Sequence, residues 1–361
     1  MELAGRGAGI VTHEPLLEAL QAVGASTDEL GIRVQERVAF DRQGRTIARL
    51  HFPQLVTSWD RIHAGLRALV PEGRYLLGRV LTGYEEGPDR IVAQFADGKT
   101  DEADLLIGAD GFRSAARARM LPQTVPEYAG YVVWRALAPE SALPEDIRET
   151  VFPHFGIFAP NDMQLIGYPI AGPGNDLRPG HRSYNVVWYC RVPSRDLRDM
   201  LTDAEDRRHD VSIPPPLVRD EIVARAMDRA ARRLPPAFAK ILRLGERPFF
   251  TPIYDHRSPI MASGRVALSG DAACGVRPHA GMGVTKAALD ALALARHLAA
   301  APMPQALRAY SAERTAASRR AWLRARTLGS YISDSDAERN RDGASHPFLG
   351  AIMRETAVMV A

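Results

Sequence analysis

The spacing of hydrophobic and polar positions changes twice along the chain. In residues 1–124 strand-like and helical runs alternate; a strand is predicted at 74–80, and a serine opens a predicted helix at 58–70. A short apolar run at 103–107 leads directly into a glycine-rich turn and then a helical stretch at 114–120. A strand, a turn and a helix in this order are typical of a parallel sheet.

Strand-like runs dominate the middle of the chain, and the first pattern returns after it. Residues 125–255 hold most of the aromatic side chains, with helices only between the strands. From residue 256 onward, a buried strand is followed by a loop and two long helices, at 281–300 and 305–332. We therefore predict an α/β fold in which a mixed-sheet domain, 125–255, is inserted between two parts of a first domain, 1–124 and 256–361.

Composition narrows the class of protein only a little. Apolar residues make up 46% of the 361 residues and charged residues 25%, with a net charge of +3. These values are ordinary for a globular protein and predict neither nucleic acid nor a membrane as a partner. Two cysteines without a CxxC motif, a polar start and no apolar run of about 18 residues predict a cytoplasmic protein. The histidines show no metal-ligand spacing, so we expect no metal.

The first candidate site follows the buried strand near residue 268. Gly270 and Asp271 lie where such a strand ends, which is the edge at which open α/β sheets bind ligands. A carboxylate there can accept hydrogen bonds from ribose or ribityl hydroxyls. Residues 278–283 then open a long helix, whose glycines admit a flat ligand and whose N-terminus supplies free N–H groups. This suits a ring that becomes anionic on reduction, although an ordinary crossover loop would share the pattern.

The second candidate site is the turn after residue 107. Asp110 lies in the turn, and Arg113 and Arg117 lie one helical turn apart, within reach of a phosphate. Near the first site, His279 is a candidate to orient a substrate or accept its proton. The alternative for His279 is a loop histidine that bonds the backbone. Cys274 is predicted to be a small buried residue.

The two motifs together resemble a known family. GADGxxSxxR at 108–117 and GDAAxxxxPxxGxGxxxAxxDAxxL at 270–294 resemble the FAD-binding signatures of single-component, FAD-dependent aromatic hydroxylases, the para-hydroxybenzoate hydroxylase-like family. Residues 128–132 (YAGYV), Trp134-Arg135 and residues 277–279 (RPH) are similar to its 2,6-dihydroxypyridine 3-monooxygenase-like group. The resemblance implies a three-layer, Rossmann-like FAD-binding domain with an inserted substrate domain and C-terminal helices.

The resemblance also implies site residues. It places Asp271 on the ribityl chain, Asp110 and Arg113 near the pyrophosphate, and Arg61 near the adenosine half of FAD. The remaining cofactor-binding residues that it implies are Arg6, Gly7, Ala8, Gly9, Ile10, Gly270, Pro278, Ala280, Gly281, Met282, Gly283, Val284 and Thr285.

Aromatic and histidine side chains of the middle domain are the candidates for binding substrate. They are His154, Tyr168, Tyr184, Trp188 and Tyr189. Alternate residues of a strand face opposite sides, so Tyr184 and Trp188 share one face while Tyr189 takes the other with Val187. For each candidate, ordinary packing within the sheet is the alternative.

The implied activity is a monooxygenase cycle. NADH or NADPH reduces FAD, the reduced flavin takes up O2 as a C4a-hydroperoxide, and one oxygen atom is transferred to a phenolic or hydroxylated N-heteroaromatic ring. His279 is the predicted catalytic residue. The partners are then a small aromatic substrate and O2, and the resemblance allows a homodimer. The alternatives are a flavin oxidase or reductase without hydroxylation, and a catalytically impaired flavoprotein remnant.

One family feature does not appear in the sequence. There is no GxGxxG motif; Gly5, Gly7 and Gly9 give GxGxG without a preceding strand, which resembles the family's loop against the flavin. We expect the family's first βαβ unit to be encoded upstream of Met1, so that this sequence is a shortened gene model. The alternative is a genuinely short protein that lacks the unit and binds FAD poorly. Because that strand is central and buried in such sheets, its loss would weaken both the fold and FAD binding.

Overall fold

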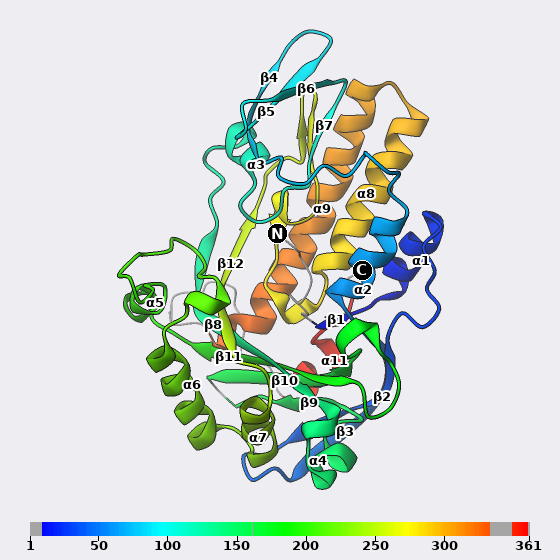
Figure 1. Cartoon of the computed structure of the whole chain (residues 1–361). Coiled ribbons are helices and arrows are strands. Elements are labelled where there is room, and N and C mark those ends of the chain that lie inside the picture. The colour runs from blue at the N-terminus through cyan, green and yellow to red at the C-terminus, as the bar shows by residue number, and fades with distance from the viewer. Residues whose placement is uncertain (1–8, 161, 333–348, 360–361) are drawn as a thin grey trace.

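The computed structural model describes residues 9–160, 162–332 and 349–359, and a nine-stranded mixed sheet crosses the whole width of its lower half (Figure 1). Its strands pair antiparallel except at the junction of β2 and β9, which is parallel. In spatial order the strands are β1 (Gly9–Val11), β3 (Thr46–Ser58), β2 (Ile32–Phe40), β9 (Phe155–Phe158), β10 (Met163–Ile170), β11 (Ser183–Arg191), β8 (Glu127–Pro139), β12 (Phe249–Arg257) and β15 (Cys274–Gly275).

The two faces of this sheet serve different purposes, because alternate side chains of each strand point to opposite sides. On one face Trp188 and Tyr184 pack against the helices drawn below the sheet in Figure 1. On the other face Tyr189 and Val187 pack toward the C-terminal end of the chain. The helices of the first face are α4 (Glu145–Thr150), α5 (Ser194–Met200), α6 (Asp220–Arg233) and α7 (Pro236–Leu244).

A smaller parallel pair of strands carries the second layer. β7 (Leu106–Gly108) pairs in parallel with β14 (Val266–Leu268), which also pairs with β13 (Ala262–Ser263). Within the described residues β7 has no strand on its other edge, where Ile107 is 49% exposed. Packed around this layer are α3 (Ala115–Met120), α8 (Gly283–Ala300), α9 (Met303–Gly329) and the hairpin sheet of β4 (Leu81–Glu86), β5 (Ile91–Phe95) and β6 (Thr100–Ala103).

Shorter elements complete the chain. Ser58 caps α2 (Trp59–Ala68) by accepting a hydrogen bond from the Arg61 N–H at 3.3 Å, as the predicted helix start requires. The others are α1 (Glu14–Ala22), which packs on α8, α11 (Leu349–Glu355), and the 3₁₀ turns η1 (Glu140–Ala142), η2 (Pro173–Asn175), η3 (Pro215–Leu217), η4 (Gly270–Ala272), η5 (Pro278–Ala280) and η6 (Ser330–Ile332).

The structure differs from the predicted strand at 74–80 and bears on the predicted domain boundary at residue 125. The strand predicted at 74–80 is wrong, because those residues form turns and the first strand of the hairpin begins at Leu81. The large sheet also crosses the predicted boundary at residue 125, since β2 and β3 are hydrogen-bonded into it through β9. No helix in the described part of the chain is long and apolar enough to cross a membrane.

Candidate functional site

A cavity of about 350 Å³ lies between the large sheet and the loop that enters α8. The sheet supplies an aromatic and aliphatic wall, the loop supplies backbone and one carboxylate, and the C-terminal segment closes a third side. Its lining residues are Gly9, Ile10, Val11, Trp59, Arg135, Phe155, Ile166, Tyr168, Val187, Tyr189, Asp271, Val276, Pro278, His279, Gly281, Gly283, Val284, Thr356 and Ala357.

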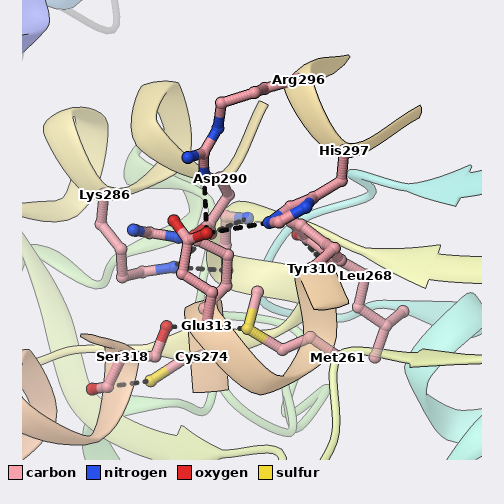
Figure 2. A network of polar contacts seen from close by, with 12 residues as sticks. Met261, Leu268, Cys274, Lys286, Asp290, Arg296, His297, Tyr310, Glu313 and Ser318 are labelled. Carbon is pink, nitrogen blue, oxygen red and sulfur yellow. Dashed lines mark hydrogen bonds and ion pairs between the residues drawn. The ribbon is translucent and has the colours of Figure 1, made fainter. Parts of the chain in front are cut away.

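The GD turn is held from beneath by a buried ion cluster (Figure 2). Gly270 adopts φ +61°, and the Lys286 ammonium donates to its carbonyl at 2.8 Å. The Gly270 N–H donates to the carboxylate of Asp290 at 3.0 Å, and Lys286 also lies 3.3 Å from that carboxylate. Arg314 on α9 pairs with the second Asp290 oxygen at 2.8 Å. Two cations around one buried carboxylate thus fix the turn that presents Asp271 to the cavity.

Asp271 itself is exposed, and its carboxylate lines the cavity. Partial desolvation by the surrounding protein raises its pKa, and the nearby Lys286 acts in the opposite direction. Carboxyl oxygens accept hydrogen bonds, and this side chain is reached by solvent. It is therefore available to accept hydrogen bonds from hydroxyl groups of a ligand.

The first turn of α8 borders the same cavity. Gly281 adopts a left-handed conformation with φ +66°, and Met282, at the N-cap, offers no side-chain cap. A Cβ placed on Gly283 would meet no atom of the described residues within 4 Å, so these residues leave this side of the helix start open. The free N–H groups and the positive end of the helix dipole favour an anion or an electron-rich edge here. The glycine-rich loop thus fits a flat ring that carries carbonyl oxygens.

His279 is bonded on both ring nitrogens inside the protein. Its Nε2 lies 2.9 Å from the Tyr131 hydroxyl and its Nδ1 lies 2.7 Å from Oε1 of Gln164. The side chain is fully buried, and burial together with the nearby Arg277 lowers its pKa to about 3. A neutral imidazole with both nitrogens engaged is poorly suited to accept a proton from a substrate. The geometry therefore favours a positioning role and does not support the predicted proton-accepting one.

The predicted substrate residues separate between the two sheet faces. Tyr168 and Tyr189 line the cavity, and burial raises the pKa of both hydroxyls, that of Tyr189 to about 12. Tyr184 and Trp188 are turned to the opposite face, in the helix-covered core. His154 lies outside the cavity, with Nδ1 3.8 Å from Glu36. Strand alternation and loop position thus place these last three residues away from this cavity, and a role for them in binding substrate stays a prediction.

The predicted cofactor residues are likewise divided. Gly9, Ile10, Asp271, Pro278, Gly281, Gly283 and Val284 line the cavity. Ala280 and Met282 are buried against α9, and Gly270 lies beneath the cavity wall. Thr285 is buried and lies 2.9 Å from Nδ1 of His13. The predicted residues Arg6, Gly7 and Ala8 lie outside the described residues.

The residues expected near the pyrophosphate and the adenosine lie away from this cavity. Arg113 is exposed and donates to Ser212 at 2.7 Å, and Asp110 accepts from the backbone of α3. Arg117 is buried and donates to the carbonyls of Phe112 and Ala272, at 2.7 and 3.1 Å, so it ties the two motifs together. Arg61 donates to the carbonyl of Asn175 at 2.9 Å.

Sequence analysis missed two parts of the cavity. Arg135 on β8 lines it, yet Trp134-Arg135 was read only as part of a resemblance. The C-terminal residues Thr356 and Ala357 also line it, and no local pattern marks a segment that reaches the site from the end of the chain. Strand alternation alone could have placed Arg135 on the face of Val133, opposite Trp134.

Comparisons with known proteins agree with this architecture. Residues 128–255 match an FAD binding domain-like model, and residues 251–325 match an FAD binding domain model. The chain is 31% identical over 295 residues to a 2,6-dihydroxypyridine 3-monooxygenase of Paenarthrobacter nicotinovorans, which covers 81% of this chain and 73% of the relative. It is 27% identical over 326 residues to an aurachin C monooxygenase/isomerase of Stigmatella aurantiaca, covering 85% and 75%.

A solved structure shares the whole arrangement. That of 2,6-dihydroxypyridine-3-hydroxylase from Arthrobacter nicotinovorans matches with a TM-score of 0.87 at 27% identity, covering 98% of this chain and 87% of that chain. The parallel layer, the large mixed sheet and the glycine-rich helix start between them define an FAD-binding oxidoreductase. The chain belongs to the family of FAD-dependent aromatic monooxygenases. The predicted family, α/β fold with a large mixed sheet, FAD cofactor and enzyme class are thereby confirmed.

Proposed function

We propose that this chain hydroxylates a small phenolic or hydroxylated N-heteroaromatic ring, with FAD held at the loop that enters α8 and NADH or NADPH as the electron donor. The observation that carries the proposal is the cavity in which Asp271, the open Gly283 and the uncapped helix start meet an aromatic wall. The relatives named as monooxygenases support the reaction type.

The residues fit the ring and ribityl parts of FAD. Backbone N–H groups of the first turn of α8 face the space that a ring edge would take, and Asp271 offers acceptors for hydroxyls. When bound, FAD supplies electron transfer from the nicotinamide and the activation of O2.

The chain's own part is to position the substrate ring and exclude water. Phe155 and Tyr168 stack with ring centroids 5.3 Å apart, and with Val187 they form an apolar wall. Such a wall disfavours water next to the reacting atoms, which limits the loss of activated oxygen as peroxide. His279 holds the cavity floor through its bonds to Tyr131 and Gln164.

The test begins with the visible absorption of the purified chain incubated with FAD. We expect flavin absorbance with near-stoichiometric FAD, and its loss on Gly283→Val, because a branched side chain would fill the open side of the helix start. Gly65→Ala, in α2 with nothing within 4 Å, is the matched control and should bind FAD as the parent does. A chain that binds no FAD, or a Gly283→Val variant that binds it normally, contradicts the proposed site.

The reaction is tested on the FAD-loaded chain. NADH and NADPH are each supplied with a panel of hydroxylated benzenes and pyridines, and oxygenated product is quantified against hydrogen peroxide. Hydroxylation predicts product close to one equivalent of nicotinamide oxidised for at least one ring. Peroxide alone across the panel would instead identify an oxidase or reductase.

A further inference from the structure

Arg135 is a cation in the cavity wall that has no hydrogen-bond or ion-pair partner in the described part of the chain. It lies on β8 beside Trp134, which is packed into the opposite face. Of the described residues, none forms a hydrogen bond or an ion pair with Arg135. The side chain is half-buried and lines the cavity, where its charge partly offsets the rise that burial causes in the pKa of the two cavity tyrosines.

The surroundings of Arg135 are apolar along a whole row of the sheet. Its cross-strand neighbour on β11 is Val187, whose own neighbour on β10 is Ile166, and Ile157 on β9 follows. On the other side, β12 places Phe249 opposite Arg135. A guanidinium among such side chains gives up part of its hydration and gains no hydrogen bond from the protein in return.

The carboxylates of the cavity do not compensate this charge. Asp271 is the acidic side chain among the lining residues, and it belongs to the loop on the opposite wall, outside ion-pair distance of Arg135. Two buried arginines elsewhere in the chain are paired with carboxylates: Arg314 pairs with Asp290, and Arg326 pairs with Asp255. A cation left open toward a ligand cavity is therefore a specific feature of this position.

We propose that Arg135 receives an oxyanion carried by the substrate ring, so that the cavity selects aromatic rings in their anionic form. This inference rests on the proposed function, because it names the substrate class of the same cavity. A planar guanidinium donates two parallel N–H bonds to a carboxylate or approaches a ring oxygen with one, and both are strong when the acceptor is charged. The aromatic wall holds the ring, and Arg135 orients it by its charged substituent.

The proposal also explains how a ring hydroxyl is ionised without a base. His279 has both nitrogens engaged, and burial raises the pKa of the tyrosines, so neither is suited to take the proton. A cation beside the ring lowers the pKa of its hydroxyl, and the proton then leaves to bulk water before or during binding. An ionised ring is richer in electrons, which favours oxygenation.

The experiment compares matched anionic and neutral probes by calorimetry on the FAD-loaded chain. The pairs are 4-nitrophenolate with 4-nitroanisole and 4-nitrobenzoate with 4-nitrobenzamide. We expect the parent chain to prefer at least one anion over its neutral partner by about ten-fold. Arg135→Met should abolish that preference while binding the neutral probe within about three-fold of the parent. Arg135→Lys should keep part of the anion preference. The probe pair whose preference falls more in Arg135→Met shows whether Arg135 binds a ring oxygen or a carboxylate.

The control and the refuting results are distinct. Arg296→Met, on the exposed end of α8 where Arg296 pairs with Glu313, should bind every probe as the parent does. The absorbance of 4-nitrophenol adds a second readout: bound to the parent, it should ionise at lower pH than in buffer, and bound to Arg135→Met it should not. A parent chain without anion preference, or an Arg135→Met variant that retains it, overturns the inference. Arg135-dependent anion binding in an FAD-loaded chain that gives only hydrogen peroxide with the panel of rings would instead refute the proposed hydroxylation alone.

Discussion

Replacing Arg37 by methionine should release the C-terminal segment from the cavity and destabilise the protein. Arg37 lies on β2, is fully buried, and donates from Nη1 to the carbonyls of Met353 and Thr356 at 2.8 and 2.6 Å. Its Nη2 donates to Gln54 at 2.8 Å. Through these bonds a strand near the start of the sequence holds the segment that supplies Thr356 to the cavity wall.

The size of the effect follows from two opposing contributions. Each hydrogen bond from a charged donor stabilises by about 1.5–3 kcal/mol, so three give about 5–9 kcal/mol. Against this, burial lowers the pKa of Arg37 from 12.5 to about 10, which corresponds to a desolvation cost of about 3 kcal/mol. The difference predicts a loss of about 2–6 kcal/mol in the free energy of unfolding. That is a large part of the roughly 5–15 kcal/mol of a typical domain.

Urea unfolding followed by tryptophan fluorescence measures this loss, and limited proteolysis with mass spectrometry shows whether the C-terminal segment becomes cleavable. Arg49→Met is the matched control, because Arg49 lies on the adjacent β3 and pairs with Glu36 at the surface. Its expected cost is below about 1 kcal/mol. If Arg37→Met unfolds within about 0.5 kcal/mol of the parent with an equally protected C-terminal segment, the reasoning about buried charged bonds is wrong here.

Three further predictions test the loop and its support. Gly281→Ala should lower the free energy of unfolding by at least about 1 kcal/mol, because Gly281 adopts φ +66° and a Cβ there would come within 2.9 Å of the backbone of Ala357. The control Gly65→Ala, in α2, should instead raise it by up to about 1 kcal/mol. Equal effects of the two variants in urea unfolding would contradict this prediction. The His279 ring should show no NMR titration between pH 5 and 8. Its pKa of about 3 in the folded protein lies below the unfolded value of 6.5, so its contribution to the free energy of unfolding falls as the pH drops from 6.5 toward 3. A ring that titrates near pH 6 would disprove its burial. Lys286→Met should weaken FAD binding and lower the free energy of unfolding by about 2–4 kcal/mol, because it removes the cation that donates to the Gly270 carbonyl. The control Lys240→Met, at an exposed position, should change neither quantity. Normal FAD affinity of Lys286→Met would show that Lys286 does not support the turn.

Local sequence patterns pointed to several residues that the structure places at one cavity, because such patterns reflect local physics. A buried strand followed by Gly-Asp, and glycines at the start of a long helix, have few structural interpretations, and the structure places Asp271 and Gly283 at one cavity. Strand alternation likewise predicted that Tyr184 and Tyr189 lie on opposite faces of the sheet. Alternation alone did not say which face meets the cavity, since both faces are apolar and buried.

The sequence by itself thus determined the family, the parallel strand–turn–helix units and the two-sided strands of the large sheet, because these depend on residues near one another in the chain. Only the tertiary structure decided what distant segments do together. It joined β2 to β9 across more than a hundred residues and brought Thr356 to the cavity through Arg37. It also buried His279 between Tyr131 and Gln164, and left Arg135 facing the cavity with no partner among residues 9–160, 162–332 and 349–359. Burial, and therefore the charge state and role of a side chain, is set by neighbours that sequence spacing does not reveal.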